Sequence, residues 1–252
     1  MRVVSLVPSL TETLLVAGVE VVGRTRYCVH PGPLAKEIPI VGGTKDLSWD
    51  KLVALGADLL VLDQEENLPW MLEQSPIPVH VFHATEIAVM PGELRRLSND
   101  FAGPSREALN RMADRWEKVV AAPVKAWDWT HLPGELKREG LARPWDQVLY
   151  LIWKKPWMSV AKDTFIASVF EKLGAGSYWP PFAQKYPEVD LADFSPDKTL
   201  LLLSSEPYPF GNKWEAEKEL PFTKVLVDGE SFSWFGLRTL QFLEVELGLG
   251  PP

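Results

Sequence analysis

The chain has one cysteine in 252 residues, no cluster of basic residues and no long apolar run. A single cysteine, Cys28, excludes an internal disulfide. The formal net charge of -8, with no concentration of Lys and Arg, argues against nucleic acid as a partner. A membrane-spanning helix needs about 20 consecutive apolar residues, so we expect no membrane insertion either.

The N-terminal apolar run is short. It extends from Val3 to Val7, is interrupted by Ser5 and ends at Pro8. No small-residue cleavage site follows it, and it is too short for the core of a signal peptide. We therefore expect a cytoplasmic protein. The alternative is a periplasmic or extracellular protein in its mature form, from which an export signal has been removed.

Motifs of catalysis are missing as well. The sequence contains no HExxH, no EF-hand loop, no GxGxxG and no recognisable order of Ser, His and Asp. The segment from Val41 to Asp46 lacks the glycine and lysine order of a phosphate loop, so we interpret it as a glycine turn that presents Thr44 and Lys45. We expect a protein that is not an enzyme, with no catalytic residue and no intrinsic cofactor.

Two segments, 58–67 and 198–207, share one sequence pattern. Each is an uninterrupted apolar run that ends in acidic and polar residues. A run that is apolar at every position is typical of a parallel strand buried on both faces. Ligands of open α/β sheets bind beyond the carboxyl ends of such strands. The sequence therefore predicts two ligand-facing edges, one in each half.

Strand and helix patterns alternate in both halves at spacings typical of βαβ units. Between the halves, residues 104–121 have helical periodicity, whereas 124–145 read as irregular. We expect an α/β fold in which two α/β lobes with mostly parallel sheets are joined by a single long rigid α-helix, with a ligand cleft between the lobes. The expected domains are an N-terminal lobe at 1–100, a connecting helix at 101–124 and a C-terminal lobe at 125–252. Strands are predicted at 2–7, 20–23, 58–62, 78–82, 147–152, 199–203 and 224–227.

Helix signals are of the usual kinds. Ser9 with Glu12 predicts a capping box for a helix that ends at Gly18. Ser48 predicts the cap of a helix that ends at Gly56. Other helices are predicted at 67–74, 86–98, from Asp163 to Gly174, and from about 235 to 247.

Candidate binding residues follow the predicted strand ends. In an extended chain Cys28 and His30 point to the same face, where both could ligate a metal or the axial position of a metal chelate. The alternatives are a buried cysteine with a hydrogen-bonded histidine, and a nucleophile with its base. Glu65 and Glu66 could bind a cation, accept hydrogen bonds from a ligand or cap a helix, which is also the simplest role for Asn67.

Aromatic residues are the second kind of candidate. The chain has eleven tryptophans, and most of these rings are expected to pack in the core. Those beside polar strand ends could also line a pocket for a flat ligand. In the second half the candidates near strand ends are Trp153, Trp157, Glu206, Phe210, Phe232 and Trp234.

Several segments together resemble a known family. Val4-Ser-Leu-Val-Pro-Ser-Leu-Thr-Glu12, Val22-Gly-Arg-Thr-Arg-Tyr-Cys-Val-His-Pro31 and Val41-Gly-Gly-Thr-Lys45 are followed by the apolar strand from Ala57. The second half adds 153–163, 203–207 and 228–234. These segments resemble the substrate-binding proteins of vitamin B12 and iron-chelate ABC importers, also called helical backbone metal receptors. The resemblance spans nearly the whole chain.

The resemblance implies a receptor that holds a metal chelate between two lobes and delivers it to an ABC permease. Corrinoids, haem and ferric siderophores are the implied ligands, and we favour a corrinoid. The alternatives are a cytosolic enzyme or carrier that handles a tetrapyrrole, and an interaction module without a ligand. The implied site takes Tyr27, His30, Lys45, Glu65 and Glu66 from the first lobe and Trp153, Trp157, Glu206, Phe210 and Trp234 from the second.

Overall fold

The structure is a computed structural model that describes residues 1–250, and it divides into two compact units. The first unit comprises Met1–Ala84, Ala88–Val120 and Trp234–Gln241. The second comprises Thr85–Ile87, Ala121–Ser233 and the residues from Phe242 onwards. A division at residue 125 would place Trp234–Gln241 in the second half, yet these residues belong to the first unit.

The first unit contains a five-stranded sheet in the order β3-β2-β1-β4-β5, and every strand pair in it is parallel. All five residues of β4 are buried, as a run that is apolar at every position predicts. In parallel sheets the carboxyl ends of all strands lie at one edge, so this sheet gathers its candidate site residues there. The strands are β1 (Arg2–Ser5), β2 (Glu20–Thr25), β3 (Ile40–Gly42), β4 (Leu59–Asp63) and β5 (Val79–Phe82).

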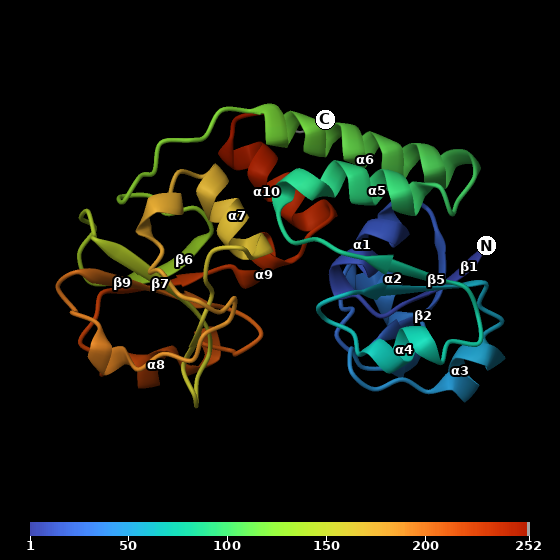
Figure 1. The fold of residues 1–252 in the computed structure, drawn as a ribbon, viewed down its shortest axis with the longest axis horizontal. Coiled ribbons are helices and arrows are strands. Elements are labelled where there is room, and N and C mark those ends of the chain that lie inside the picture. Colours follow the sequence, from blue (N-terminus) through green and yellow to red (C-terminus); the bar gives the residue numbers. More distant parts are fainter. Residues whose placement is uncertain (251–252) are drawn as a thin grey trace. The chain divides into compact units, whose positions relative to one another are not determined.

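Helices cover both faces of this sheet. In Figure 1, α5 (Met90–Ser98) and α6 (Gly103–Ala121) lie on one side, and α3 (Trp49–Ala54) and α4 (Pro69–Glu73) lie on the other. The predicted long helix is present as α6, with 19 residues. The shorter helices α1 (Pro8–Val16) and α2 (Gly32–Lys36) follow β1 and β2.

The predicted helix caps were partly wrong. Ser48 caps α3 by accepting a hydrogen bond from the N–H of Lys51, as expected. The capping box at Ser9 and Glu12 does not form, because α1 already begins at Pro8 and its N-cap, Val7, makes no side-chain bond. Proline suits the first turn of a helix, where its missing N–H costs nothing.

The second unit also has a five-stranded sheet, in the order β6-β10-β9-β7-β8. Its three central strands are parallel, and the two edge strands pair antiparallel. The segment expected to be irregular contains β6, which is rich in charge and mostly not buried, so it has no apolar signal. The strands are β6 (Glu135–Glu139), β7 (Gln147–Trp153), β8 (Met158–Ser159), β9 (Thr199–Ser204) and β10 (Lys224–Val227).

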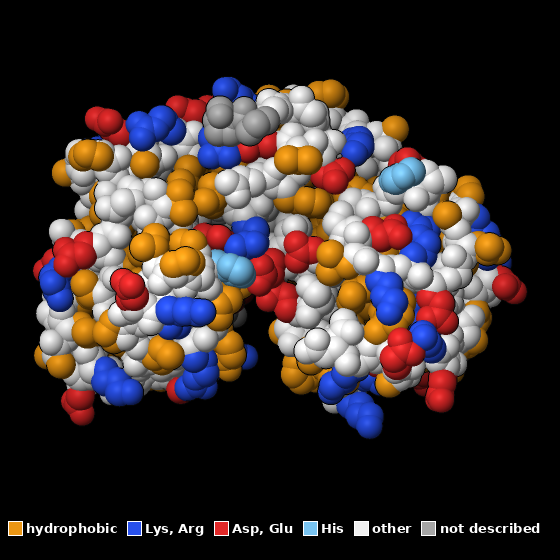
Figure 2. All heavy atoms as spheres, turned by 180° about the vertical axis from the view of Figure 1, so that it is seen from behind, with side chains coloured by type: hydrophobic (Ala, Val, Ile, Leu, Met, Phe, Trp, Pro, Cys, Tyr) orange, Lys and Arg blue, Asp and Glu red, His pale blue; other side chains and the backbone are white. Residues whose placement is uncertain are grey.

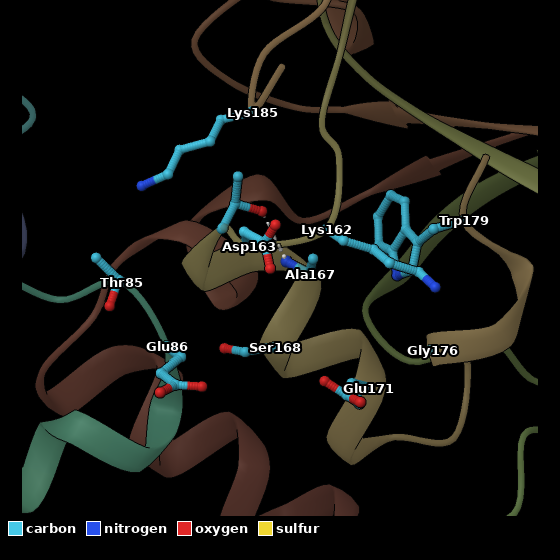
Figure 3. Close-up of a pocket in the computed structure, with 11 residues that line it drawn as sticks. Thr85, Glu86, Lys162, Asp163, Ala167, Ser168, Glu171, Gly176, Trp179 and Lys185 are labelled. Atoms are coloured by element: carbon cyan, nitrogen blue, oxygen red, sulfur yellow. Dashed lines mark hydrogen bonds between the residues drawn. The ribbon is translucent and has the colours of Figure 1, made fainter. Parts of the chain in front are cut away.

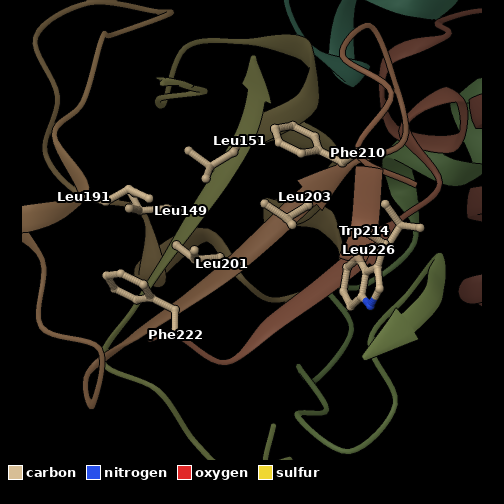
Figure 4. Packing of buried hydrophobic residues seen from close by; sticks show 9 residues of the cluster. All are labelled: Leu149, Leu151, Leu191, Leu201, Leu203, Phe210, Trp214, Phe222 and Leu226. Carbon is tan, nitrogen blue, oxygen red and sulfur yellow. The ribbon is translucent and has the colours of Figure 1, made fainter. Parts of the chain in front are cut away.

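In the second unit α7 (Phe165–Lys172) and α9 (Gly229–Ser233) lie on one side of the sheet, and α8 (Trp214–Glu217) lies on the other (Figure 1). The final helix, predicted from about 235 to 247, is present as α10 (Leu237–Glu246), and the short helix α9 before it was not predicted. Between β7, β9, β10 and α8 lies a core of leucines and aromatic rings, which Figure 4 shows: Leu149, Leu151, Leu191, Leu201, Leu203, Phe210, Trp214, Phe222 and Leu226.

The expected fold class, two α/β lobes with mostly parallel sheets and a long helix, is confirmed. On the face shown in Figure 2, acidic and basic side chains are interspersed with apolar ones. Within residues 1–250, no helix combines the length and the apolar character that a bilayer span requires.

Candidate functional site

Two loops of the first unit are joined at the carboxyl end of β4. The side-chain amide of Asn67 donates to the carbonyl oxygen of Thr44 over 2.8 Å. The Oδ1 atom of Asn67 accepts from the backbone N–H of Asp63, also over 2.8 Å. Asn67 therefore does not cap α4, whose N-cap is Leu68. Its amide instead holds the glycine turn beside the end of β4.

Asp63 organises the acidic end of the same strand. Its Oδ1 atom accepts hydrogen bonds from the backbone N–H groups of Glu65, at 2.8 Å, and Glu66, at 3.0 Å. Burial raises the pKa of Asp63, and the two N–H donors act in the opposite direction. The turn so formed presents the two predicted glutamates at the edge of the sheet, with Glu65 Oε1 4.0 Å from His83 Nε2.

Tyr27 is tied to the glycine turn through a neighbouring arginine. The guanidinium of Arg26 lies 5.7 Å from the centre of the Tyr27 ring and pairs with Asp46 at 2.6 Å. A side chain at Gly42 would approach the Asp46 carbonyl oxygen to 2.1 Å, so only glycine fits this turn. Tyr27 is 52% exposed, and Lys45 is also exposed. The structure therefore brings together the predicted residues that follow β2, β3 and β4.

His30 and Trp234 form the aromatic part of the first unit's candidate site. Their ring centres are 5.3 Å apart and their planes meet at 73°. The guanidinium of Arg238 lies 5.4 Å from the centre of the Trp234 ring. Arg238 donates from Nε and Nη2 to both carboxylate oxygens of Glu12, at 3.0 and 2.7 Å. A forked pair of this kind fixes the guanidinium, so it also orients Trp234 against His30.

Sequence reasoning missed Arg238 and assigned Trp234 to the second lobe. The segment around Trp234 is bound to the first unit, because the N–H of Leu237 donates to Thr13 Oγ1 at 3.0 Å. The Glu12–Arg238 pair joins residues 226 positions apart, and no local pattern signals such a contact.

Cys28 does not share a face with His30. Its side chain is fully buried, whereas His30 is partly exposed, and both residues lie beyond β2, which ends at Thr25, in a segment that is not a strand. The thiol is hydrogen-bonded to the hydroxyls of Thr11 and Thr25, each at 3.1 Å. Burial raises the pKa of Cys28, which favours the neutral thiol over the metal-binding thiolate. Within residues 1–250 no three His, Cys, Asp or Glu side chains gather as a metal site.

In the second unit, Trp153 and Trp157 follow β7. Trp153 is 40% exposed, with its ring centre 5.6 Å from that of Tyr208. Trp157 is partly buried and stacks on Phe210 at 6.0 Å, with an interplanar angle of 3°. Of the two predicted tryptophans, Trp153 therefore offers the larger accessible surface.

Between these tryptophans, Lys154 forms a buried ion pair. Its Nζ donates to both carboxylate oxygens of Glu217 at 2.8 Å and lies 5.0 Å from the centre of the Trp157 ring. The side chain of Glu217 is 1% exposed, and that of Lys154 is 21% exposed. The pair joins the end of β7 to α8, so Lys154 is not the solvated lysine that a simple surface role would predict.

Phe210 and Phe232 are core residues. Both side chains are fully buried, and Phe232 stacks on Phe170 at 4.4 Å. A side chain without exposed surface cannot contact a ligand, so the prediction that Phe210 and Phe232 bind the ligand does not agree with the structure. Glu206 is partly exposed and accepts a hydrogen bond from Ser233 Oγ at 2.9 Å.

A cavity of about 470 Å³ lies in the second unit, beside the N-terminal half of α7 (Figure 3). No residue predicted from the sequence lines it. Its hydroxyl groups bond mainly to the chain itself: Ser168 Oγ accepts from the N–H of Ile87, and Thr164 Oγ1 caps α7 by accepting from the N–H of Ala167. The charged lining residues are Glu86, Lys162, Asp163, Glu171 and Lys185.

Comparison with known proteins identifies the fold. No family model and no curated protein sequence matches the chain. Solved structures do match it over nearly their whole length. The periplasmic vitamin B12 binding protein BtuF of Vibrio cholerae has a TM-score of 0.68 at 18% identity, covering 98% of this chain and 96% of that one. The periplasmic heme binding protein HutB of Vibrio cholerae has a TM-score of 0.69 at 17% identity, covering 100% and 99%.

An ABC transporter substrate-binding protein from Listeria monocytogenes EGD-e is similar to the same degree. Its TM-score is 0.67 at 14% identity, and the match covers 98% of this chain and 97% of that one. At these identities the likeness establishes the fold. The resemblance stated from the sequence is confirmed at that level: this chain has the fold of solved binding proteins for vitamin B12 and heme.

The expected cytoplasmic localisation is wrong. The solved structures that share this fold include periplasmic binding proteins. The expectation rested on the short apolar run from Val3 to Val7. This run lies largely in strand β1 of the first sheet, so its short length is explained by the fold and says nothing about export.

Proposed function

We propose that the protein is a non-catalytic substrate-binding protein for a metal chelate, and that this chelate is a corrinoid. The protein binds the corrinoid outside the cytoplasm and delivers it to an ABC permease. The observation that carries the proposal is the His30–Trp234 pair beside the carboxyl ends of a parallel sheet. The similar structures support it, because proteins with this fold bind vitamin B12 or heme.

The proposed binding needs no covalent step. Exposed aromatic rings such as Tyr27 and Trp153 would cover the flat apolar faces of the chelate, and a few polar groups would fix its orientation. An imidazole nitrogen of His30 would take an axial position on the metal, since imidazole is a good ligand for cobalt and iron. The proposed ligand-binding residues are Tyr27, His30, Thr44, Lys45, Glu65, Glu66, Trp153, Trp157, Glu206 and Trp234.

A titration of the full chain tests the proposal. Cyanocobalamin, haem and ferric siderophores are added separately while tryptophan fluorescence and the melting temperature are recorded. We expect saturable quenching by the corrinoid and a higher melting temperature. At a ligand concentration 100 times Kd, binding raises the free energy of unfolding by about 2.7 kcal/mol. Saturation by haem or a siderophore alone would replace the corrinoid, and no response to any chelate would overturn the proposal.

The role of His30 has its own test. In the His30→Ala variant we expect aquacobalamin, whose axial water is exchangeable, to bind roughly ten- to a hundredfold more weakly. The change in its visible spectrum on binding should also disappear, because no protein nitrogen replaces the water. His131→Ala is the matched control, since the side chain of His131 is 91% exposed and belongs to the second unit. An unchanged spectral shift in His30→Ala would remove the axial role.

A further inference from the structure

One buried side chain, that of Asn67, joins two loops of the first unit that carry proposed ligand-binding residues. One loop is the glycine turn after β3, with Thr44 and Lys45. The other is the acidic turn after β4, with Glu65 and Glu66. In the sheet, β2 and β1 lie between β3 and β4, and neighbouring strands are about 4.8 Å apart. The pairing of strands therefore does not by itself bring these two loops into contact.

Asn67 uses both ends of its side-chain amide in this contact. Its Nδ2 group donates to the carbonyl oxygen of Thr44, and its Oδ1 atom accepts from the N–H of Asp63, each over 2.8 Å. The backbone N–H of Asn67 also donates to the carbonyl oxygen of Asp63 at 3.1 Å. Asn67 is 8% exposed and Asp63 is 3% exposed. Because water has little access here, breaking these bonds would leave buried polar groups without partners.

Each of the two loops is also fixed by a bond of its own. In the glycine turn, the N–H of Gly43 donates to the carbonyl oxygen of Asp46 at 2.7 Å. In the acidic turn, Asp63 Oδ1 accepts from the N–H groups of both glutamates. Since the amide of Asn67 bonds to both turns, neither turn can move away from the other without breaking a buried hydrogen bond.

We propose that Asn67 is a positioning residue for ligand binding: its amide fixes the loops of Lys45 and Glu65 in the free protein, so that the ligand does not have to order them. The inference rests on the proposed function, in which both loops contact the chelate. Ordering loops on binding lowers affinity, and a side chain that orders them beforehand removes this cost. Asn67 acts through the two loops and is not itself proposed to contact the ligand.

The variant Asn67→Ala tests the inference on the full chain. We expect cyanocobalamin to bind about tenfold more weakly, because the ligand must then order both loops. In the free variant, hydrogen exchange of the Gly43 and Glu65 backbone N–H groups should be faster than in the wild type. Saturation with cyanocobalamin should restore the wild-type rates. A merely structural role would lower the melting temperature and leave the affinity of the folded protein unchanged.

A second variant, Asn67→Asp, has nearly the same shape as the wild type. It keeps an oxygen that accepts from the N–H of Asp63 and removes only the donor to Thr44. The variant therefore releases the glycine turn while the end of β4 stays bonded. We expect weaker binding of cyanocobalamin and faster exchange at Gly43 in this variant as well.

Asn110→Ala is the matched control. Asn110 belongs to α6 of the same unit, and its Oδ1 atom accepts from Ser98 Oγ at 2.8 Å. We expect wild-type affinity and wild-type exchange at Gly43. Wild-type affinity in folded Asn67→Ala, or weaker binding without faster exchange in the loops, would overturn the inference and leave the proposed function standing. If the wild type does not bind cyanocobalamin, the proposed function fails and the inference fails with it.

Discussion

Replacing Lys154 with methionine is expected to lower the free energy of unfolding by about 3 to 5 kcal/mol, the usual cost of breaking a buried ion pair. The substitution removes both hydrogen bonds to Glu217 and leaves a carboxylate that is 1% exposed without its cation. Urea denaturation followed by tryptophan fluorescence measures the change.

The neighbouring lysine provides the matched control. Lys155 is exposed, so Lys155→Met makes the same chemical change without a buried partner and should alter stability by less than about 0.5 kcal/mol. The double variant Lys154→Met/Glu217→Gln should recover part of the loss, because no charge is then buried alone. Equal stability of Lys154→Met and Lys155→Met would mean that the pair contributes nothing.

Replacing Arg238 with alanine should weaken chelate binding roughly ten- to a hundredfold, although Arg238 itself is not proposed to contact the ligand. Without its guanidinium, Trp234 loses the group that orients it, and His30 loses its fixed neighbour. The free energy of unfolding should also fall by about 1 to 3 kcal/mol, because the largely buried carboxylate of Glu12 loses its hydrogen bonds to the Arg238 guanidinium. The measurements are aquacobalamin affinity and the ring-current shift of the His30 protons in the NMR spectrum.

A structural loss alone would not move the His30 signals while the protein stays folded. Arg143→Ala is the control, since it removes a guanidinium 3.9 Å from the ring centre of Trp145, which belongs to the second unit, whereas His30 and Trp234 belong to the first. Arg238→Lys keeps the charge but loses the fork, so it should rescue affinity only in part. Wild-type affinity and unshifted His30 signals in Arg238→Ala would refute a positioning role for this residue.

Local patterns predicted most of the elements. The apolar runs became the buried strands β4 and β9, and Gly18 and Gly56 follow α1 and α3 with positive φ, as helix-ending glycines do. These signals are readable because backbone geometry and burial on both faces constrain residues close together in sequence. The charged edge strand β6 escaped prediction, because an edge strand with polar side chains has no apolar periodicity.

The candidate site was less readable than the fold. Loops after strands could be named as candidates, because parallel strands place their carboxyl ends together, and Tyr27 and Glu65 were proposed in this way, whereas Thr44 was proposed from its glycine turn. The partners that fix them could not. Asn67 binds Thr44 across 23 positions, Glu217 binds Lys154 across 63, and Arg238 binds Glu12 across 226. Such contacts depend on how elements pack, and no periodicity encodes them.

The return of residues 234–241 to the first unit also bears on synthesis. Three hydrogen bonds join this segment to earlier parts of the first unit. The N–H of Leu237 donates to Thr13 and the guanidinium of Arg238 donates to Glu12. The carbonyl oxygen of Gly236 accepts from the indole of Trp116. On the ribosome these partners emerge only after Ala121–Ser233, the largest part of the second unit, has been translated. The first unit is therefore completed only near the end of synthesis, and a shortened product that stops before residue 234 would lack the partners of Glu12, Thr13 and Trp116.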